Sequence, residues 1–240
     1  LAMKKGFTKY SNPAGIFDLR NEICKKLKKE NKINSIPEEI IITPGSKMAL
    51  SLALMSLLQP NDEIIYISPA YTSYLPQILM SENKVIIKKL NLDFKTYEIN
   101  FNKLKKLISH RTKVILINFP HNPTGKILNI NIAKKFEKIL KKYKKCFLIS
   151  DEIYEKLIFN KKKNISPASI KSISNRVLTI NGFSKAYAMT GWRIGYCHAK
   201  KNLIEKMVKI QQHINTNVPV FTQIAALNAY RKKSNHIKKF

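Results

Sequence analysis

Side chains that could do chemistry follow several predicted strands of this sequence. Asp151 ends the apolar stretch 146–150, and Tyr154 lies three residues beyond it. A carboxylate at the end of a buried strand is costly unless a cation pairs with it, so Asp151 indicates a cationic partner, with a helix or turn cap as the alternative. Lys185 follows another strand and precedes an apolar segment with glycines, where partial dehydration would favour its nucleophilic form. In that segment Arg193 offers a planar fork for a phosphate.

Two further loops carry candidate binding groups. Gly45, Ser46 and Lys47 begin a predicted helix, whose free N–H groups and positive dipole end attract anions. Considered alone, this segment is better explained as an ordinary helix cap. Asn122 lies in a loop with two prolines and Gly125, and its amide can both donate and accept hydrogen bonds. Considered alone, that loop too is better explained as a rigid turn.

Taken together, the loops require a single ligand with four features. It must carry an anionic group, an aromatic ring that takes a proton, a hydroxyl-type acceptor and a carbonyl that a lysine can attack. Pyridoxal 5′-phosphate has all four. The order of these groups along the chain therefore predicts a pyridoxal phosphate site, with Lys185 as the residue that forms a Schiff base.

Strands and helices alternate along the sequence. Strands are predicted at 39–43, 63–67, 84–88, 114–118, 146–150 and 176–180, and helices at 16–29, from 46 onward, at about 71–80, and at 130–143, 203–213 and 220–232. This alternation indicates an α/β fold with a mainly parallel sheet and right-handed crossovers. Ligands bind at the carboxyl ends of the strands in such sheets, so we expect the candidate loops to converge there.

The composition excludes several classes of protein. The chain has 240 residues, 44% of them hydrophobic, which is too many for a disordered polycation. Three scattered cysteines form no metal-binding or disulfide pattern and indicate a reducing compartment. No apolar run approaches the roughly 20 residues of a membrane span, and residues 1–10 contain no signal-peptide core. We therefore expect a cytoplasmic protein that holds no metal and does not enter a membrane.

The net charge of +29 would suit a nucleic-acid-binding protein. Lysine accounts for 39 of the 44 basic residues and arginine for five. Nucleic-acid-binding sites rely on arginine for base and phosphate contacts as well as on lysine, so the shortage of arginine weakens this hypothesis. We favour a solvated, lysine-rich surface with no specific nucleic-acid partner, and keep nucleic-acid binding as an alternative.

Four runs of residues resemble a known family. They are 8–20, 122–125 (Asn-Pro-Thr-Gly), 150–155 (Ser-Asp-Glu-Ile-Tyr-Glu) and 181–196. Through them the sequence is similar to the class I, fold-type I pyridoxal-phosphate-dependent aminotransferases, closest to the bacterial aspartate aminotransferase branch. The resemblance implies the large domain of that α/β fold, with a mainly parallel sheet flanked by helices. Residues 1–240 are expected to form this cofactor-binding domain, with the family's N-terminal lid missing and its C-terminal small domain largely absent.

The resemblance also implies roles for residues around the cofactor ring. Lys185 would form the Schiff base and then move the proton between the substrate α-carbon and the cofactor, while Asp151 would keep the pyridine nitrogen protonated. Asn122 and Tyr154 would hydrogen-bond the phenolic oxygen of the ring, and Tyr71 would stack on the ring. The expected catalytic residues are Lys185, Asp151 and Tyr154.

Other residues are expected to bind the phosphate and the substrate. The phosphate would be held by Gly45, Ser46, the amide of Lys47 and Arg193. Tyr10 would reach the phosphate of a neighbouring subunit, which implies a homodimer. The Lys47 side chain can contact the distal carboxylate of a dicarboxylic substrate, with a plain surface lysine as an equal alternative. The expected substrate-binding residues are Lys47, Asn122 and Tyr71.

The resemblance predicts a transaminase. Such an enzyme moves an amino group between an amino acid, here of the aspartate or glutamate type, and a 2-oxo acid in a ping-pong Schiff-base cycle. Another enzyme of the same cofactor class, a C–S lyase or a synthase, is an alternative, and so is an inactive copy, although the presence of every cofactor group argues against decay. Trp192, the single tryptophan, is predicted to be a core residue.

Overall fold

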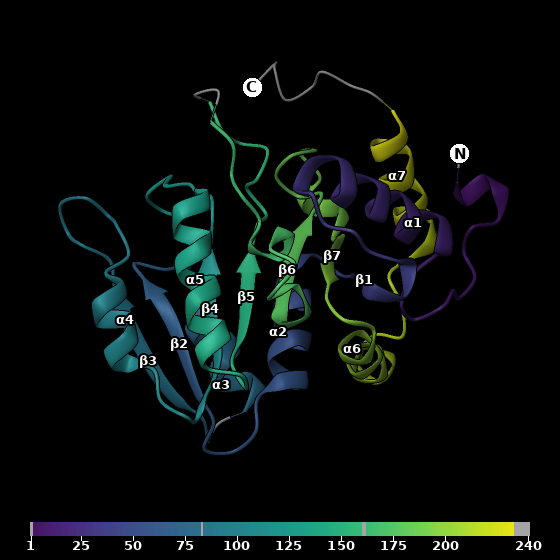
Figure 1. Ribbon diagram of the computed structural model, residues 1–240. Coiled ribbons are helices and arrows are strands. Elements are labelled where there is room, and N and C mark those ends of the chain that lie inside the picture. The colour runs from purple at the N-terminus through teal and green to yellow at the C-terminus, as the bar shows by residue number, and fades with distance from the viewer. Residues whose placement is uncertain (1, 83, 160–161, 233–240) are drawn as a thin grey trace.

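A seven-stranded sheet crosses the centre of the computed structural model, which describes residues 2–82, 84–159 and 162–232 (Figure 1). Its strands are β1 (Ile40–Thr43), β2 (Glu63–Ser68), β3 (Ile86–Asn91), β4 (Thr112–Asn118), β5 (Phe147–Asp151), β6 (Val177–Gly182) and β7 (Gly195–His198). They lie in the order β1-β7-β6-β5-β4-β2-β3. β7 is antiparallel to both of its neighbours, and the other described strands share one direction. The carboxyl ends of these other strands therefore meet at one edge of the sheet.

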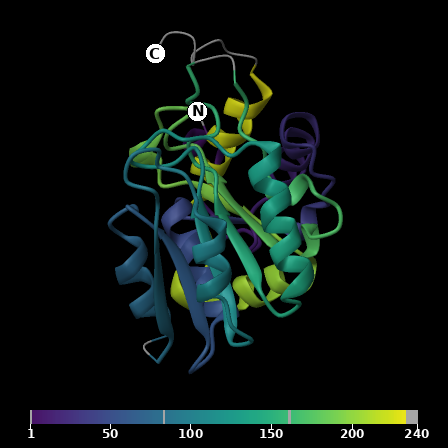
Figure 2. The same ribbon diagram turned by 60° about the vertical axis from the view of Figure 1, so that its left-hand side comes forward.

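Helices cover both faces of the sheet (Figures 1 and 2). They are α1 (Phe17–Lys26), α2 (Ser46–Leu57), α3 (Tyr74–Ser81), α4 (Phe101–Leu107), α5 (Ile130–Lys142), α6 (Lys201–Ile214) and α7 (Val220–Arg231). Apolar residues of α1, α4, α5 and α7 share one core cluster with the sheet. Apolar residues of α2, α3 and α6 share a second cluster on the opposite face. The protein is thus a three-layer α/β/α structure. No described helix is long and apolar enough to cross a membrane.

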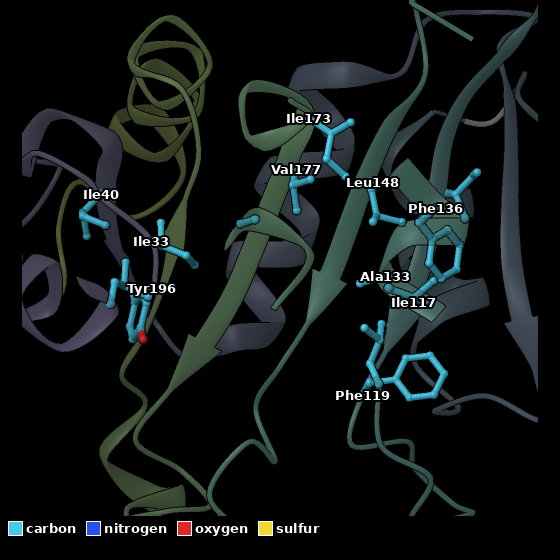
Figure 3. Packing of buried hydrophobic residues seen from close by; sticks show 14 of the residues in the cluster. Ile33, Ile40, Ile117, Phe119, Ala133, Phe136, Leu148, Ile173, Val177 and Tyr196 are labelled. Atoms are coloured by element: carbon cyan, nitrogen blue, oxygen red, sulfur yellow. The ribbon is translucent and has the colours of Figure 1, made fainter. Parts of the chain in front are cut away.

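The central strands are apolar on both sides because each face is covered by helices. In β4, Ile115 and Ile117 belong to the first cluster, whereas Val114 and Leu116 belong to the second. Side chains alternate between the faces of a strand, so a strand between two helical layers needs a continuous apolar run. Figure 3 shows Phe136 of α5 near Ile117, inside the first cluster.

All the strands and helices predicted from the sequence are present, with ends shifted by a few residues. The predicted strand 84–88 is found as Ile86–Asn91, and the predicted helix 16–29 ends as an α-helix at Lys26, where a π-helical turn follows. The sequence patterns miss β7 and α4. β7 has only four residues and depends on pairing with β1 and β6, and α4 has only seven, so neither contains enough residues to show a clear period.

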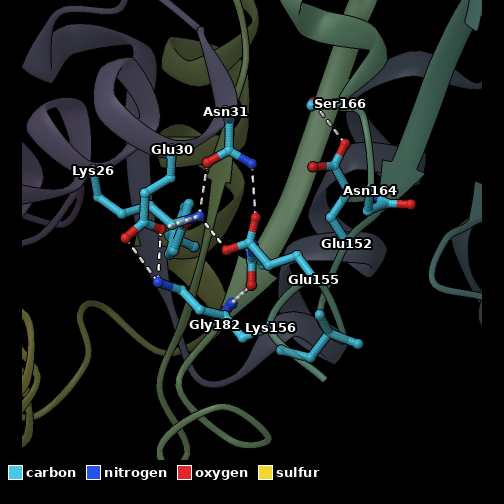
Figure 4. Close-up of polar contacts among 12 residues, drawn as sticks. Lys26, Glu30, Asn31, Glu152, Glu155, Lys156, Asn164, Ser166 and Gly182 are labelled. Atoms are coloured by element: carbon cyan, nitrogen blue, oxygen red, sulfur yellow. Dashed lines mark hydrogen bonds and ion pairs between the residues drawn. The ribbon is translucent and has the colours of Figure 1, made fainter. Parts of the chain in front are cut away.

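A buried ion pair joins α1 to the loop after β5 (Figure 4). Lys26 Nζ binds the Glu155 carboxylate and donates a hydrogen bond to Asn31 Oδ1 (2.8 Å), while Asn31 Nδ2 donates to Glu155 Oε2 (2.7 Å). Burial alone would lower the pKa of Lys26, but pairing with Glu155 raises it. Burial alone would raise the pKa of Glu155, but Lys26 and Asn31 lower it. Both groups therefore stay charged, and the pair links α1 to the turn that carries Tyr154.

Replacing Lys26 with Met should destabilise the chain strongly. The substitution keeps the apolar stem but leaves the Glu155 carboxylate buried without its cation, so we expect a loss of about 3–5 kcal/mol in the free energy of unfolding. Urea denaturation measures this loss. Lys25→Met is the matched control on the same helix, because the Lys25–Glu22 pair is exposed and should contribute less than about 1 kcal/mol. Equal losses in the two variants would contradict the assigned role of the buried pair.

Candidate active site

A pocket of about 300 Å³ lies at the carboxyl edge of the sheet. It is lined from α2, α3, the ends of β4 and β5, and the segment between β6 and β7. Its lining includes seven of the residues predicted from the sequence: Ser46, Lys47, Tyr71, Asp151, Tyr154, Lys185 and Arg193. The expected convergence of loops that are far apart in the chain is confirmed.

Asp151 lies at the carboxyl end of β5 and is 8% exposed. Tyr74 Oη donates a hydrogen bond to its Oδ2 (2.7 Å), and the Ile153 amide donates to its Oδ1 (3.2 Å). Asn118 Nδ2 donates to its backbone carbonyl (2.9 Å). Burial raises the pKa of the Asp151 carboxyl, and the hydrogen bonds from Tyr74 and Ile153 partly offset that rise. Asp151 is therefore a positioned acceptor that a cationic group in the pocket would stabilise further.

Tyr154 and Asn122 meet at the same edge. The side-chain Nδ2 of Asn122 donates to Tyr154 Oη (3.2 Å), and the backbone N–H of Asn122 donates to Asn118 Oδ1 (2.8 Å). Burial raises the pKa of Tyr154, and the hydrogen bond from Asn122 opposes this rise. Tyr154 is thus a neutral phenol that can donate its hydroxyl proton to a ligand.

Lys185 lies in the turn after β6, with its Nζ 5.6 Å from the centroid of the Tyr154 ring. Its side chain is exposed, so the expectation of a dehydrated lysine is wrong for this chain. The prediction that Trp192 is a core residue is also wrong, because its side chain is 49% exposed. Trp192 ends a 3₁₀ turn at the surface, where the chain reverses toward β7.

The Arg193 guanidinium lies against Gly45, where only a residue without a side chain leaves it enough room. Gly45 has a φ of 82°, and a Cβ added there would lie 2.5 Å from Arg193 Nη2. Arg193 also adopts a positive φ of 48°, and its Nη1 donates to the Thr190 carbonyl (2.7 Å). A Cβ at Gly195 would lie 2.5 Å from the Ser46 nitrogen, so β7 packs directly against the start of α2. The guanidinium and the N-terminus of α2 are therefore adjacent and can hold one anion between them.

Tyr71 and Lys47 form one wall of the pocket. Lys47 Nζ lies 5.6 Å from the centroid of the Tyr71 ring, and the Tyr71 side chain is 37% exposed. A hydrogen bond with Ser73 lowers the pKa of Tyr71, burial opposes this effect, and Lys47 lowers the pKa further. An exposed aromatic face and an ammonium group are thus available to a ligand.

Tyr10 is not brought into this pocket. Its side chain is 87% exposed and borders a separate groove beside residues 215–221. The sequence analysis missed five polar side chains of the pocket, of which Asn118 had a signal, since it ends an apolar strand. Tyr74 had none, because its role depends on a contact with Asp151 across 77 residues. The missed residues are Tyr74, Gln77, Asn118, Ser184 and Thr190.

The side chains present fit pyridoxal phosphate. Gly45 lets the Arg193 guanidinium lie close against the start of α2, where a larger residue would displace it, and a guanidinium beside a helix N-terminus suits a phosphate. Asp151 offers an acceptor for a protonated ring nitrogen, and Asn122 and Tyr154 offer donors for a phenolic oxygen. Within the described ranges, no group of three or more His, Cys, Asp or Glu side chains is arranged to hold a metal ion.

Comparison with solved structures identifies the fold. An aromatic aminotransferase from Pyrococcus horikoshii superposes with a TM-score of 0.92 at 33% identity, over 99% of this chain and 63% of that one. Thermus thermophilus aspartate aminotransferase with maleate gives a TM-score of 0.91 at 31% identity, over 99% of this chain and 60% of that one. The fold is the large domain of the fold-type I pyridoxal-phosphate-dependent transferases.

Sequence comparison leads to the same family. The chain is 33% identical to Thermotoga maritima aspartate aminotransferase over 235 residues, which cover 98% of this chain and 62% of the relative. It is 38% identical to a probable aspartate aminotransferase of Methanocaldococcus jannaschii over 96% of this chain and 61% of the relative. The chain thus spans about three fifths of the length of these relatives. The family model of the class I and II aminotransferases, which depend on pyridoxal phosphate, matches residues 1–240, and the chain belongs to that family.

Proposed function

We propose that residues 1–240 form the cofactor-binding large domain of a transaminase. The enzyme moves an amino group between an amino acid of the aspartate or glutamate type and a 2-oxo acid in a ping-pong cycle. The observation that carries this proposal is the meeting of Asp151, Tyr154, Lys185 and Arg193 in one pocket, from two motifs that are separate in the chain. The printed names of the relatives, aspartate and aromatic aminotransferases, support the reaction class.

Each part of the pocket has a task toward the cofactor. Pyridoxal phosphate supplies an electron-withdrawing ring when bound. Asp151 would accept a hydrogen bond from the ring nitrogen and keep it protonated, and Asn122 and Tyr154 would donate hydrogen bonds to the phenolic oxygen. Lys185 Nζ would bind the cofactor covalently, and its freed amine would move the proton at the substrate α-carbon. Arg193, Gly45, Ser46 and the backbone amide of Lys47 would bind the phosphate, and the exposed face of Tyr71 would pack against the ring.

Tyr10 supports a further element of the proposal, a homodimer with shared sites. Its side chain is almost fully exposed and lies outside the pocket of its own chain. A tyrosine in that position can reach an anion bound by a second copy of the chain. Sedimentation of the protein with bound cofactor measures the oligomeric state.

Lys185→Ala should abolish covalent cofactor binding. Borohydride reduction of the protein with pyridoxal phosphate should add one label to the peptide that contains Lys185, and mass spectrometry detects it. Because the same side chain transfers the proton, transamination of aspartate with 2-oxoglutarate should fall by about 10²–10⁴-fold. Lys126→Ala, an exposed lysine outside the pocket lining, is the control. Full transamination by Lys185→Ala would refute the proposal, and products of elimination instead of amino transfer would indicate a lyase.

Gly45→Ala should weaken the binding of pyridoxal phosphate. The added methyl would displace the Arg193 guanidinium from the start of α2, so we expect Kd to rise about tenfold or more, equivalent to at least about 1.4 kcal/mol. Absorbance titration measures the change. Gly6→Ala imposes the same strain of a positive φ with no atom within 4 Å of the methyl, and it should leave Kd unchanged. A Kd equal to that of the parent protein in Gly45→Ala would rule out the phosphate cradle.

Lys47→Ala tests the proposed class of substrate. If the ammonium group binds the distal carboxylate, Kd for aspartate should rise about tenfold, while Kd for alanine should stay the same. Lys47→Arg keeps the positive charge and should retain most of the affinity for aspartate. Parallel losses for aspartate and alanine would show that Lys47 does not distinguish dicarboxylic substrates.

A further inference from the structure

Tyr74 joins two parts of the pocket that lie on different elements. It is the first residue of α3, it is 3% exposed, and its hydroxyl donates to Asp151 Oδ2 at 2.7 Å. Its ring meets the Tyr71 ring edge to face, with centroids 5.7 Å apart and an interplanar angle of 87°. We propose that Tyr74 is a positioning residue that holds the Asp151 carboxylate ionised and aimed at the cofactor ring, and that supports the ring of Tyr71. This inference rests on the proposed function.

The carboxylate of Asp151 is held at both of its oxygens. Tyr74 Oη donates a hydrogen bond to Oδ2, and the backbone N–H of Ile153 donates one to Oδ1 at 3.2 Å. The Ile153 bond joins residues two apart and belongs to the turn after β5, whereas the Tyr74 bond crosses from another helix. Only the Tyr74 bond therefore ties the orientation of the Asp151 side chain to the helix that follows Tyr71.

A tyrosine suits this position because its hydroxyl, while protonated, can donate a hydrogen bond to the carboxylate. Burial, and then the charge of Asp151, raise the pKa of Tyr74 well above its usual value, so the hydroxyl keeps its proton. Burial also raises the pKa of Asp151, and a buried carboxyl stays ionised at neutral pH only with sufficient donors or cations nearby. A hydrogen bond to a charged group is stronger than one between neutral groups, so the Tyr74 hydroxyl is a substantial contributor.

Other ionisable groups share the pocket with Asp151. They are Lys47, Tyr71, Tyr154, Lys185 and Arg193. The three cations have exposed side chains, so water screens their attraction for the carboxylate. The hydrogen bond from Tyr74 is buried and lacks this screening. Its removal should therefore change the titration of Asp151 more than removal of one surface cation.

The first test uses the chain without cofactor. Tyr74→Phe keeps the ring and removes the hydroxyl, so the pKa of Asp151 in the folded chain should rise further. A carboxyl whose pKa is higher in the folded than in the unfolded state costs stability as pH rises through that range. The difference in urea midpoint between the parent and Tyr74→Phe should therefore widen from about pH 4 to pH 7. Tyr143→Phe, which removes a phenol hydroxyl outside the pocket lining, should give a difference that does not vary with pH.

The second test uses bound pyridoxal phosphate. In Tyr74→Phe we expect the pH midpoint of the visible absorbance of the cofactor to move upward, because a less ionised Asp151 leaves the ring nitrogen less charged. The Kd for the cofactor should rise by about tenfold. In an Asp151→Asn background, Tyr74→Phe should cause no further shift of that midpoint, which shows that the two side chains act together.

The outcomes separate the two proposals. If the parent chain binds no pyridoxal phosphate, the proposed function fails, while the urea test still decides whether Tyr74 keeps Asp151 ionised. If the parent binds the cofactor but Tyr74→Phe changes stability equally at every pH and leaves the absorbance midpoint unmoved, Tyr74 only fills space and the inference is overturned. A widening stability difference together with a shifted midpoint supports it.

Discussion

The adjacent antiparallel pairing of β6 and β7 is the constraint on which the pocket depends. The chain leaves β6 at the carboxyl edge and returns in β7 beside it, so residues 183–194 remain at that edge. A parallel neighbour would need a long crossover that carries these residues to the other end of the sheet. Gly182 of β6 pairs with Gly195 of β7, and the absence of a side chain at Gly195 leaves room for the start of α2. One short reversal thereby brings Lys185, Arg193 and the α2 N-terminus together.

The end of β5 places two neighbouring carboxyl groups in different environments. Asp151 faces the pocket, where donors oppose the effect of burial on its pKa. Glu152 is fully buried and accepts hydrogen bonds from Ser150 and Ser166, and burial together with the charge of Glu155 raises its pKa to about 8. Glu152 is therefore mostly protonated at neutral pH and adds little negative charge beside Asp151. The two neighbouring carboxyl groups therefore differ in charge because their surroundings differ.

The high positive charge and the pocket chemistry are largely separate features. Many lysines lie on exposed faces such as that of α5, where they are solvated and paired in part with glutamates. Three cations and one buried carboxylate line the pocket. This arrangement suits a ligand with a phosphate at one side and a protonated ring nitrogen at the other. A polyanion would find no counterpart for Asp151.

The sequence by itself determined the α/β fold class and half of the residues that line the pocket. Runs such as 114–118 are apolar throughout because both faces are covered, and polar groups at the strand ends must converge when strands are parallel. The tertiary structure decided the rest: β7, the exposure of Trp192 and Lys185, and the pairs Tyr74–Asp151 and Lys26–Glu155. These pairs join residues 77 and 129 positions apart, and no local pattern encodes them. Burial and pairing are properties of neighbours in space, whereas periodicity reports only neighbours along the chain.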